Sequence, residues 1–78
     1  MTAADSIVQF TVIRSDGEWR VLRDGQDAGR FDVSVDAIES ALFRATSLID
    51  KGQDVEVFVQ DAAGRLRRVD PVGGEVLH

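Results

Sequence analysis

The side chains of this sequence that could do chemistry are carboxylates and guanidinium groups, with almost no histidine or thiol beside them. The chain has 78 residues, with fourteen Asp and Glu, nine Lys and Arg, no cysteine, and one histidine, His78. A Ser-His-Asp or Cys-His arrangement cannot be assembled from this inventory, and a zinc site lacks its usual ligands. These residue types therefore exclude the common forms of nucleophilic catalysis, and we expect no metal.

Two pairs of carboxylates lie close enough along the chain for acid–base work, Asp24 with Asp27 and Asp50 with Asp54. Both pairs fall where turns or helix ends are expected, and Asp at such places normally binds backbone amides. The sequence contains no glycine-rich phosphate loop and no calcium-loop motif. A domain with a single helix also offers little depth for a substrate. We therefore expect a protein that is not an enzyme, holds no cofactor and has no small-molecule substrate.

The elements that must position these residues begin with one amphipathic helix, predicted from Ser34 through Lys51 and closed by Gly52. At about 100° per residue, its apolar side chains form one stripe with two flanking residues. The stripe consists of Ile38, Ala41, Leu42, Ala45 and Ile49, flanked by Val35 and Leu48. Ser34 is expected to cap the first turn, and Val33 to pack on Ile38. Since a single helix cannot bury its own stripe, strands must cover it.

Five segments have the alternation or the composition of strands, at residues 7–13, 18–23, 29–33, 54–60 and 65–69. Turns containing Asp-Gly separate the first three segments, and the second turn is expected over residues 24–27. Trp19 and Val21 point to the core, and Trp19 is expected to be the largest core residue. The order of elements predicts an α+β fold, a single antiparallel β-sheet packed on one face by one α-helix (β-β-β-α-β-β).

Length and charge limit the remaining possibilities. A chain of 78 residues suits one domain, expected at 7–70 between a disordered N-terminus (1–6) and a flexible C-terminal tail (71–78). Without cysteine, a signal peptide or a long apolar run, we expect a cytoplasmic protein that does not enter a membrane. The net charge of −5 argues against general binding to nucleic acid or to anionic membranes.

The sheet face away from the helix is expected to carry more apolar residues than a solvated face needs. Ile13, Leu22 and Phe58 point there, with Arg20 among the polar residues around them. On the helix, Phe43 falls about 140° from the centre of the stripe and is expected to be an exposed, further anchor. These residues predict a non-catalytic interaction or regulatory module that forms a homo-oligomer or binds another protein. Scattered surface residues, or coverage by the C-terminal tail, would also explain them.

Arginines in the predicted hairpins leave a second function open. Arg65, Arg67 and Arg68 lie in the last hairpin, and hairpin pairing could bring them close to arginines of the first. Those of the first hairpin are Arg14, Arg20 and Arg23. A two-stranded ribbon of this kind can enter the major groove of DNA. Because acidic residues alternate with the same arginines, cross-strand ion pairs explain the pattern better, and nucleic-acid binding stays the alternative.

Three motifs follow one another along the chain. They are Gly-Glu-Trp-Arg-Val at 17–21, Ala-Ile-Glu-Ser-Ala at 37–41, and a turn at 61–64 followed by Arg65-Leu66. Their order resembles that of a family of small bacterial proteins of unknown function, and the similarity covers residues 8–71. The resemblance implies a sheet-and-helix fold and transfers no catalytic residue. More distantly, a hairpin followed by an alanine-rich helix is similar to antitoxin domains that pair with small ribonuclease toxins, which implies an antitoxin-like regulator as part of the alternative.

Overall fold

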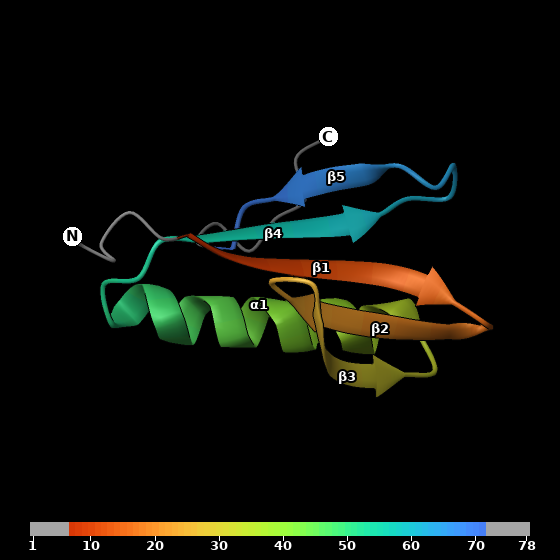
Figure 1. The fold of residues 1–78 in the computed structure, drawn as a ribbon, viewed down its shortest axis with the longest axis horizontal. Coiled ribbons are helices and arrows are strands. Elements are labelled where there is room, and N and C mark those ends of the chain that lie inside the picture. The colour runs from red at the N-terminus through yellow and green to blue at the C-terminus, as the bar shows by residue number, and fades with distance from the viewer. Residues whose placement is uncertain (1–6, 72–78) are drawn as a thin grey trace.

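The structure is a computed structural model that describes residues 7–71, which form one five-stranded sheet and one helix (Figure 1). The elements are β1 (Val8–Ser15), β2 (Glu18–Arg23), β3 (Gln26–Phe31), α1 (Ser34–Asp50), β4 (Val55–Gln60) and β5 (Leu66–Val69). The α+β class is therefore confirmed. Within this described range, no helix is long and apolar enough to cross a membrane. The expectations for residues 1–6 and 72–78 lie outside the described residues.

The sheet is mixed, so the prediction of a purely antiparallel sheet is wrong. Its strand order is β3-β2-β1-β4-β5, and β1 pairs in parallel with β4 while the other neighbouring pairs are antiparallel. The reason is the helix, because the 17 residues of α1 rise about 25 Å, roughly the length of a strand. The helix returns the chain to the end of the sheet where β1 begins, and β4 then runs beside β1 in the same direction.

The first two hairpins close with two-residue Asp-Gly turns. Asp16 and Gly17 have φ angles of 54° and 80°, and Asp24 and Gly25 have φ angles of 51° and 85°. Two consecutive positive φ angles are what a type I′ turn requires. The second turn is shorter than the predicted four residues, so β3 begins at Gln26 and not at residue 29.

The two ends of α1 differ in how their backbone groups are satisfied. At the C-terminus, Gly52 has a φ angle of 88°, and the Gln53 amide donates to the Leu48 carbonyl oxygen at 3.0 Å. This is the Schellman arrangement, and the predicted helix stop is confirmed. At the N-terminus the capping residue is Val33, which makes no side-chain hydrogen bond. The expectation that Ser34 caps the helix is wrong, because Ser34 already lies in the first turn.

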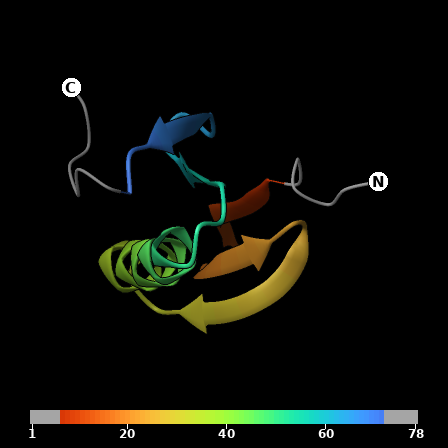
Figure 2. The same cartoon turned by 90° about the vertical axis from the view of Figure 1, so that its left-hand side faces the viewer.

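The core lies between α1 and the face of the sheet that curves around it (Figure 2). Its buried residues are Val8, Phe10, Val12, Val21, Ala37, Ala41, Ala45, Val57 and Val69. The helix therefore meets the sheet through alanines, with larger apolar residues at partial burial on their flanks. Trp19 packs against the core but is only partly buried, so its prediction as the largest core residue is wrong. The largest fully buried side chain belongs to Phe10.

Candidate functional site

The face of the sheet away from α1, here called the open face, brings the predicted apolar residues together. In the strand registers, Thr11 of β1 lies opposite Leu22 of β2 and beside Phe58 of β4. Ile13, two residues along β1, lies opposite Arg20. Since partners in neighbouring strands point to the same face, Leu22, Thr11 and Phe58 form one row with Ile13 in the next. The four residues predicted for this face therefore share one surface; they are Ile13, Arg20, Leu22 and Phe58.

The open face has no covering layer within the described chain, since α1 packs on the opposite side (Figure 2). Its three predicted apolar side chains are each half-buried by their neighbours. Leu66 of β5, with 52% of its surface exposed, points to the same face because it lies three positions before the buried Val69. Leu66 was not predicted as a site residue, although counting back from Val69 along the strand gives its orientation.

Arg20 forms a polar border of the open face, and its charge is already compensated. Its Nη2 donates to Asp27 Oδ2 at 3.0 Å, and Arg30 Nε lies 3.6 Å from the same oxygen. The hydrogen bond from Arg20, and then the one from the Gly29 amide, hold the pKa of Asp27 below its ordinary value. The Nε of Arg20 is buried without a hydrogen-bond partner in the described chain. Arg20 therefore lies against the strands and covers them with its stem.

Phe43 belongs to a different surface. Its side chain is 73% exposed, so the expected exposure is confirmed, but it is carried by α1, which covers the other side of the sheet (Figure 2). It borders a shallow groove of about 190 Å³, whose other lining residues are Phe10, Arg23, Arg44, Ser47 and Leu48. A partner docked on the open face would not reach Phe43, so the two predicted anchors do not form one site.

The arginines of the nucleic-acid alternative fall into separate places. Arg65, Arg67 and Arg68 lie on or beside β5, at one edge of the sheet. Arg20 and Arg23 lie on β2, which β1 and β4 separate from β5, a distance of about 14 Å at the usual strand spacing. The sheet order therefore separates the arginines of β5 from Arg20 and Arg23, while Arg14 lies on the central strand β1 between the two groups.

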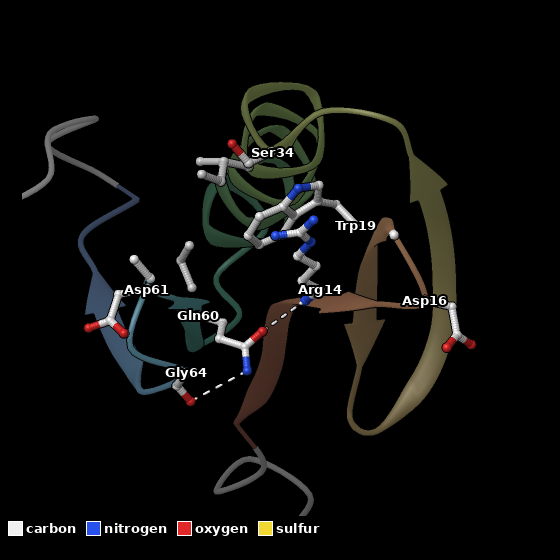
Figure 3. A pocket seen from close by; sticks show the side chains of 11 residues that line it. Arg14, Asp16, Trp19, Ser34, Gln60, Asp61 and Gly64 are labelled. Atoms are coloured by element: carbon white, nitrogen blue, oxygen red, sulfur yellow. Dashed lines mark hydrogen bonds between the residues drawn. The ribbon is translucent and has the colours of Figure 1, made fainter.

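A groove that was not predicted lies between the first hairpin turn, the β4–β5 turn and the start of α1 (Figure 3). It has a volume of about 680 Å³, more than we expected for a domain with one helix. Arg14 and Trp19 are cross-strand partners, and both side chains extend toward Ser34. The carboxylates of Asp16 and Asp61 turn outward on either side of them. Because its polar groups diverge, the groove presents no paired acid and base.

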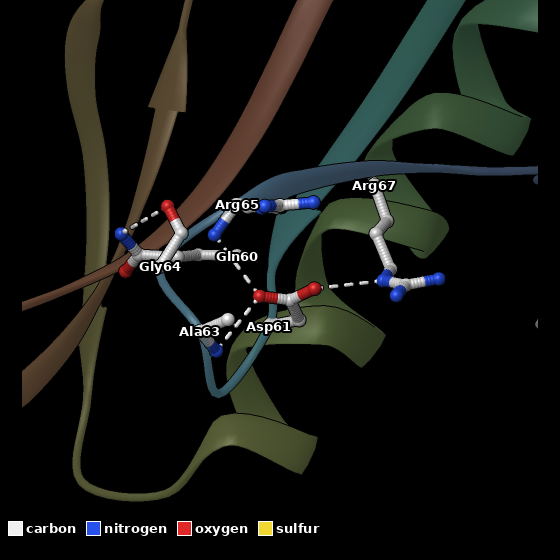
Figure 4. A network of polar contacts seen from close by, with 6 residues as sticks. All are labelled: Gln60, Asp61, Ala63, Gly64, Arg65 and Arg67. Carbon is white, nitrogen blue, oxygen red and sulfur yellow. Dashed lines mark hydrogen bonds and ion pairs between the residues drawn. The ribbon is translucent and has the colours of Figure 1, made fainter.

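The β4–β5 turn is held by the carboxylate of Asp61 (Figure 4). Its Oδ1 accepts hydrogen bonds from the amides of Ala63 at 2.9 Å and Arg65 at 3.0 Å. Its Oδ2 accepts a hydrogen bond of 2.7 Å from Arg67 Nε. The hydrogen bond from Arg67, and then the one from the Arg65 amide, hold the pKa of Asp61 below its ordinary value. This one carboxylate therefore fixes both the turn and the position of one arginine of β5.

Comparisons of the chain with protein-family models, with curated proteins and with solved structures found no match. The resemblance to the small bacterial family, and the more distant one to antitoxin domains, therefore stay predictions from the motifs. The functional proposal depends on the surfaces that the fold itself creates.

Proposed function

We propose that the protein is a non-catalytic interaction module that forms a homodimer through the open face of its sheet. The observation that supports this most directly is the row Leu22, Thr11 and Phe58, with Ile13 and Leu66 beside it on a sheet face without a second layer in the described chain. Interface centres favour aliphatic and aromatic side chains surrounded by polar residues. A face-to-face pair of sheets would bury this row in the middle of such an interface.

The charged groups on the open face are arranged so that docking leaves few of them unpaired. Arg20 is bound to Asp27 at 3.0 Å, and Gln9 Nε2 donates to Glu56 Oε1 at 3.0 Å within the same face. Groups that keep their partners lose less free energy when water is removed than isolated charges do. A small domain also gains more from association, because the monomer core consists largely of valine and alanine.

The experiment is the molar mass in solution, measured by light scattering over a concentration series. Wild type and Phe58→Glu are compared with Phe43→Glu, which makes the same change at an exposed residue of the helix. We expect wild type and Phe43→Glu to shift from monomer to dimer as the concentration rises, and Phe58→Glu to remain a folded monomer. A wild type that is monomeric throughout, or a Phe58→Glu variant that dimerises like wild type, would contradict the proposal.

A further inference from the structure

Among residues 7–71, no strand pairs with the backbone groups at the outer edge of β5, where the sheet ends. The carbonyl oxygen of Arg65 accepts a hydrogen bond from the Asp61 amide at 2.8 Å, so Arg65 turns its backbone toward β4. By the alternation of an antiparallel ladder, Leu66 and Arg68 turn their amides and carbonyls outward. Such outward groups are a template to which another strand can be added.

The ion pairs at this edge leave the arginines outside and the carboxylates inside. The Arg67 side chain is 73% exposed while that of its partner Asp61 is 22% exposed, and the corresponding values for Arg68 and Glu56 are 68% and 24%. The separation of Arg68 from Glu56 is 4.0 Å, at the limit of an ion pair. Arg65 is also exposed and forms no ion pair with the described residues. An approaching strand therefore meets three guanidinium groups along residues 65–68, with the exposed carboxylate of Asp70 just beyond the end of β5.

We propose that the outer edge of β5 binds an extended acidic segment of another protein as an added strand. Backbone hydrogen bonds to Leu66 and Arg68 hold the segment parallel or antiparallel to β5. Every second side chain of the segment points to the same face of the extended sheet. Carboxylates spaced by two residues therefore meet Arg65 and Arg67 on one face of the sheet, or Arg68 on the other face. Leu66 offers a small apolar contact between the charges.

A second copy of the same strand does not fit this edge. In a symmetric antiparallel pair of β5 strands, residues whose backbone groups turn outward, Leu66 and Arg68, pair with the same residues of the other copy. Leu66 opposite Leu66 places Arg67 opposite Arg65. Leu66 opposite Arg68 places Arg67 opposite Arg67, and the third register places Arg68 opposite Arg68. Like charges directly opposite each other destabilise a strand pair. The charge that keeps two β5 edges apart is the charge that an acidic strand would neutralise.

The acidic net charge of the protein does not prevent this recognition. The net charge is −5, but charges farther away than about 8 Å are largely screened at physiological ionic strength. The arginines of the edge lie in direct contact with the added strand. The affinity is therefore set by the local groups, and it should fall as the salt concentration rises.

The test uses a fluorescent peptide of alternating Glu and Val, with binding to the whole protein measured by fluorescence anisotropy. A second peptide keeps every carboxylate but has N-methylated amides on the side that pairs with β5. A third peptide carries Lys in place of Glu, and the fourth probe is a single-stranded DNA of equal charge.

We expect the acidic peptide to bind at least about tenfold more tightly than each of the other three probes, since several backbone hydrogen bonds or ion pairs are lost in each case. Equal binding of the N-methylated peptide or of the DNA, or no binding of the acidic peptide, would overturn the proposal.

Matched variants of the protein place the binding on β5. Arg65→Gln with Arg68→Gln removes two charges from the edge and leaves Arg67 on Asp61, and we expect peptide affinity to fall about tenfold. Arg23→Gln with Arg44→Gln removes the same net charge elsewhere and should leave the affinity within about twofold. If both double variants lose affinity equally, the binding is not on β5. Leu22→Glu, which disrupts the open face on β2, is separated from β5 by β1 and β4 and should still bind the peptide, so that this proposal and the homodimer are tested separately.

Discussion

Val57 and Phe58 are neighbours on β4, and the larger of the two is the less buried. Val57 is fully buried under α1, whereas Phe58 lies half-buried on the open face. The same contrast holds on β1, where Val12 is fully buried and Ile13 is not. Burial in this domain is therefore set by which layer covers a face, and not by how apolar a side chain is. The helix-covered face supplies the stability of the monomer, and no layer of residues 7–71 covers the open face.

The largest expected effect comes from placing a charge on the helix-covered side. Ala45 is fully buried against the sheet, and Ala45→Asp would bury a carboxylate with no partner. We expect a cost of several kcal/mol, which is comparable with the whole stability of so small a domain, so the variant should be unfolded by circular dichroism. Arg44→Asp, at the neighbouring exposed position, is the control and should melt within a few degrees of wild type. A folded Ala45→Asp variant would mean that the helix does not pack through its alanines.

Phe10 and Trp19 separate full burial from partial burial on the same side of the sheet. Phe10 is 1% exposed, and Phe10→Ala should cost about 3–5 kcal/mol in unfolding free energy. Trp19 borders the groove of Figure 3, on the helix side of the sheet, and already contacts solvent. Trp19→Ala should therefore cost only about 1–3 kcal/mol in unfolding free energy, despite the larger side chain. Urea unfolding followed by circular dichroism gives both values. A Trp19→Ala variant that is less stable than Phe10→Ala would reverse this assignment.

Val57→Ala and Phe58→Ala test the contrast between the two faces directly. Val57→Ala leaves a cavity under α1 and should cost about 2–3 kcal/mol at any protein concentration. Phe58→Ala should cost only about 1 kcal/mol in the dilute monomer, because part of its surface is already exposed. At concentrations where wild type dimerises, the difference between wild type and Phe58→Ala should grow, since association stabilises only wild type. A Phe58 effect that is large and independent of concentration would place Phe58 in the monomer core.

The α+β class could be predicted from the sequence, whereas the strand order stayed open and the purely antiparallel sheet was wrong, although the step that excludes it was within reach. After β1, β2 and β3 alternate in direction, a helix as long as the strands brings the chain back to its starting end. The next strand then runs parallel to both β1 and β3, whichever of these two free neighbours it joins. A purely antiparallel sheet was therefore excluded by the length of α1. The choice of β1 over β3 agrees with the strong burial of Val8, Phe10 and Val12, which a central strand requires.

The candidate sites were predictable where they depend on alternation, and unpredictable where they depend on how loops fold. The period of two along each strand correctly placed Ile13, Leu22 and Phe58 on one face. The groove beside Trp19 depends on the positions of two hairpin turns that are distant in the chain, which local patterns do not describe. The separation of the arginines depends on strand order, and order follows from packing of the whole sheet.

The smallest expected effect lies in acid, at the turn beside the proposed strand edge. The pKa of Asp61 is lowered from its ordinary 3.8, chiefly by the hydrogen bond from Arg67. As the pH falls, the Asp61 carboxylate takes up its proton in the unfolded chain before it does so in the folded chain, because its folded pKa is lower. The stability that this carboxylate contributes is therefore fully present above about pH 3.8 and is lost as the pH falls through the lowered folded pKa. Asp61→Asn keeps an oxygen for the two turn amides but cannot titrate, so its unfolding free energy should fall less steeply than that of wild type below about pH 4. Urea unfolding at a series of pH values measures the slopes, and parallel curves for the two proteins would show that folding does not lower the pKa of Asp61.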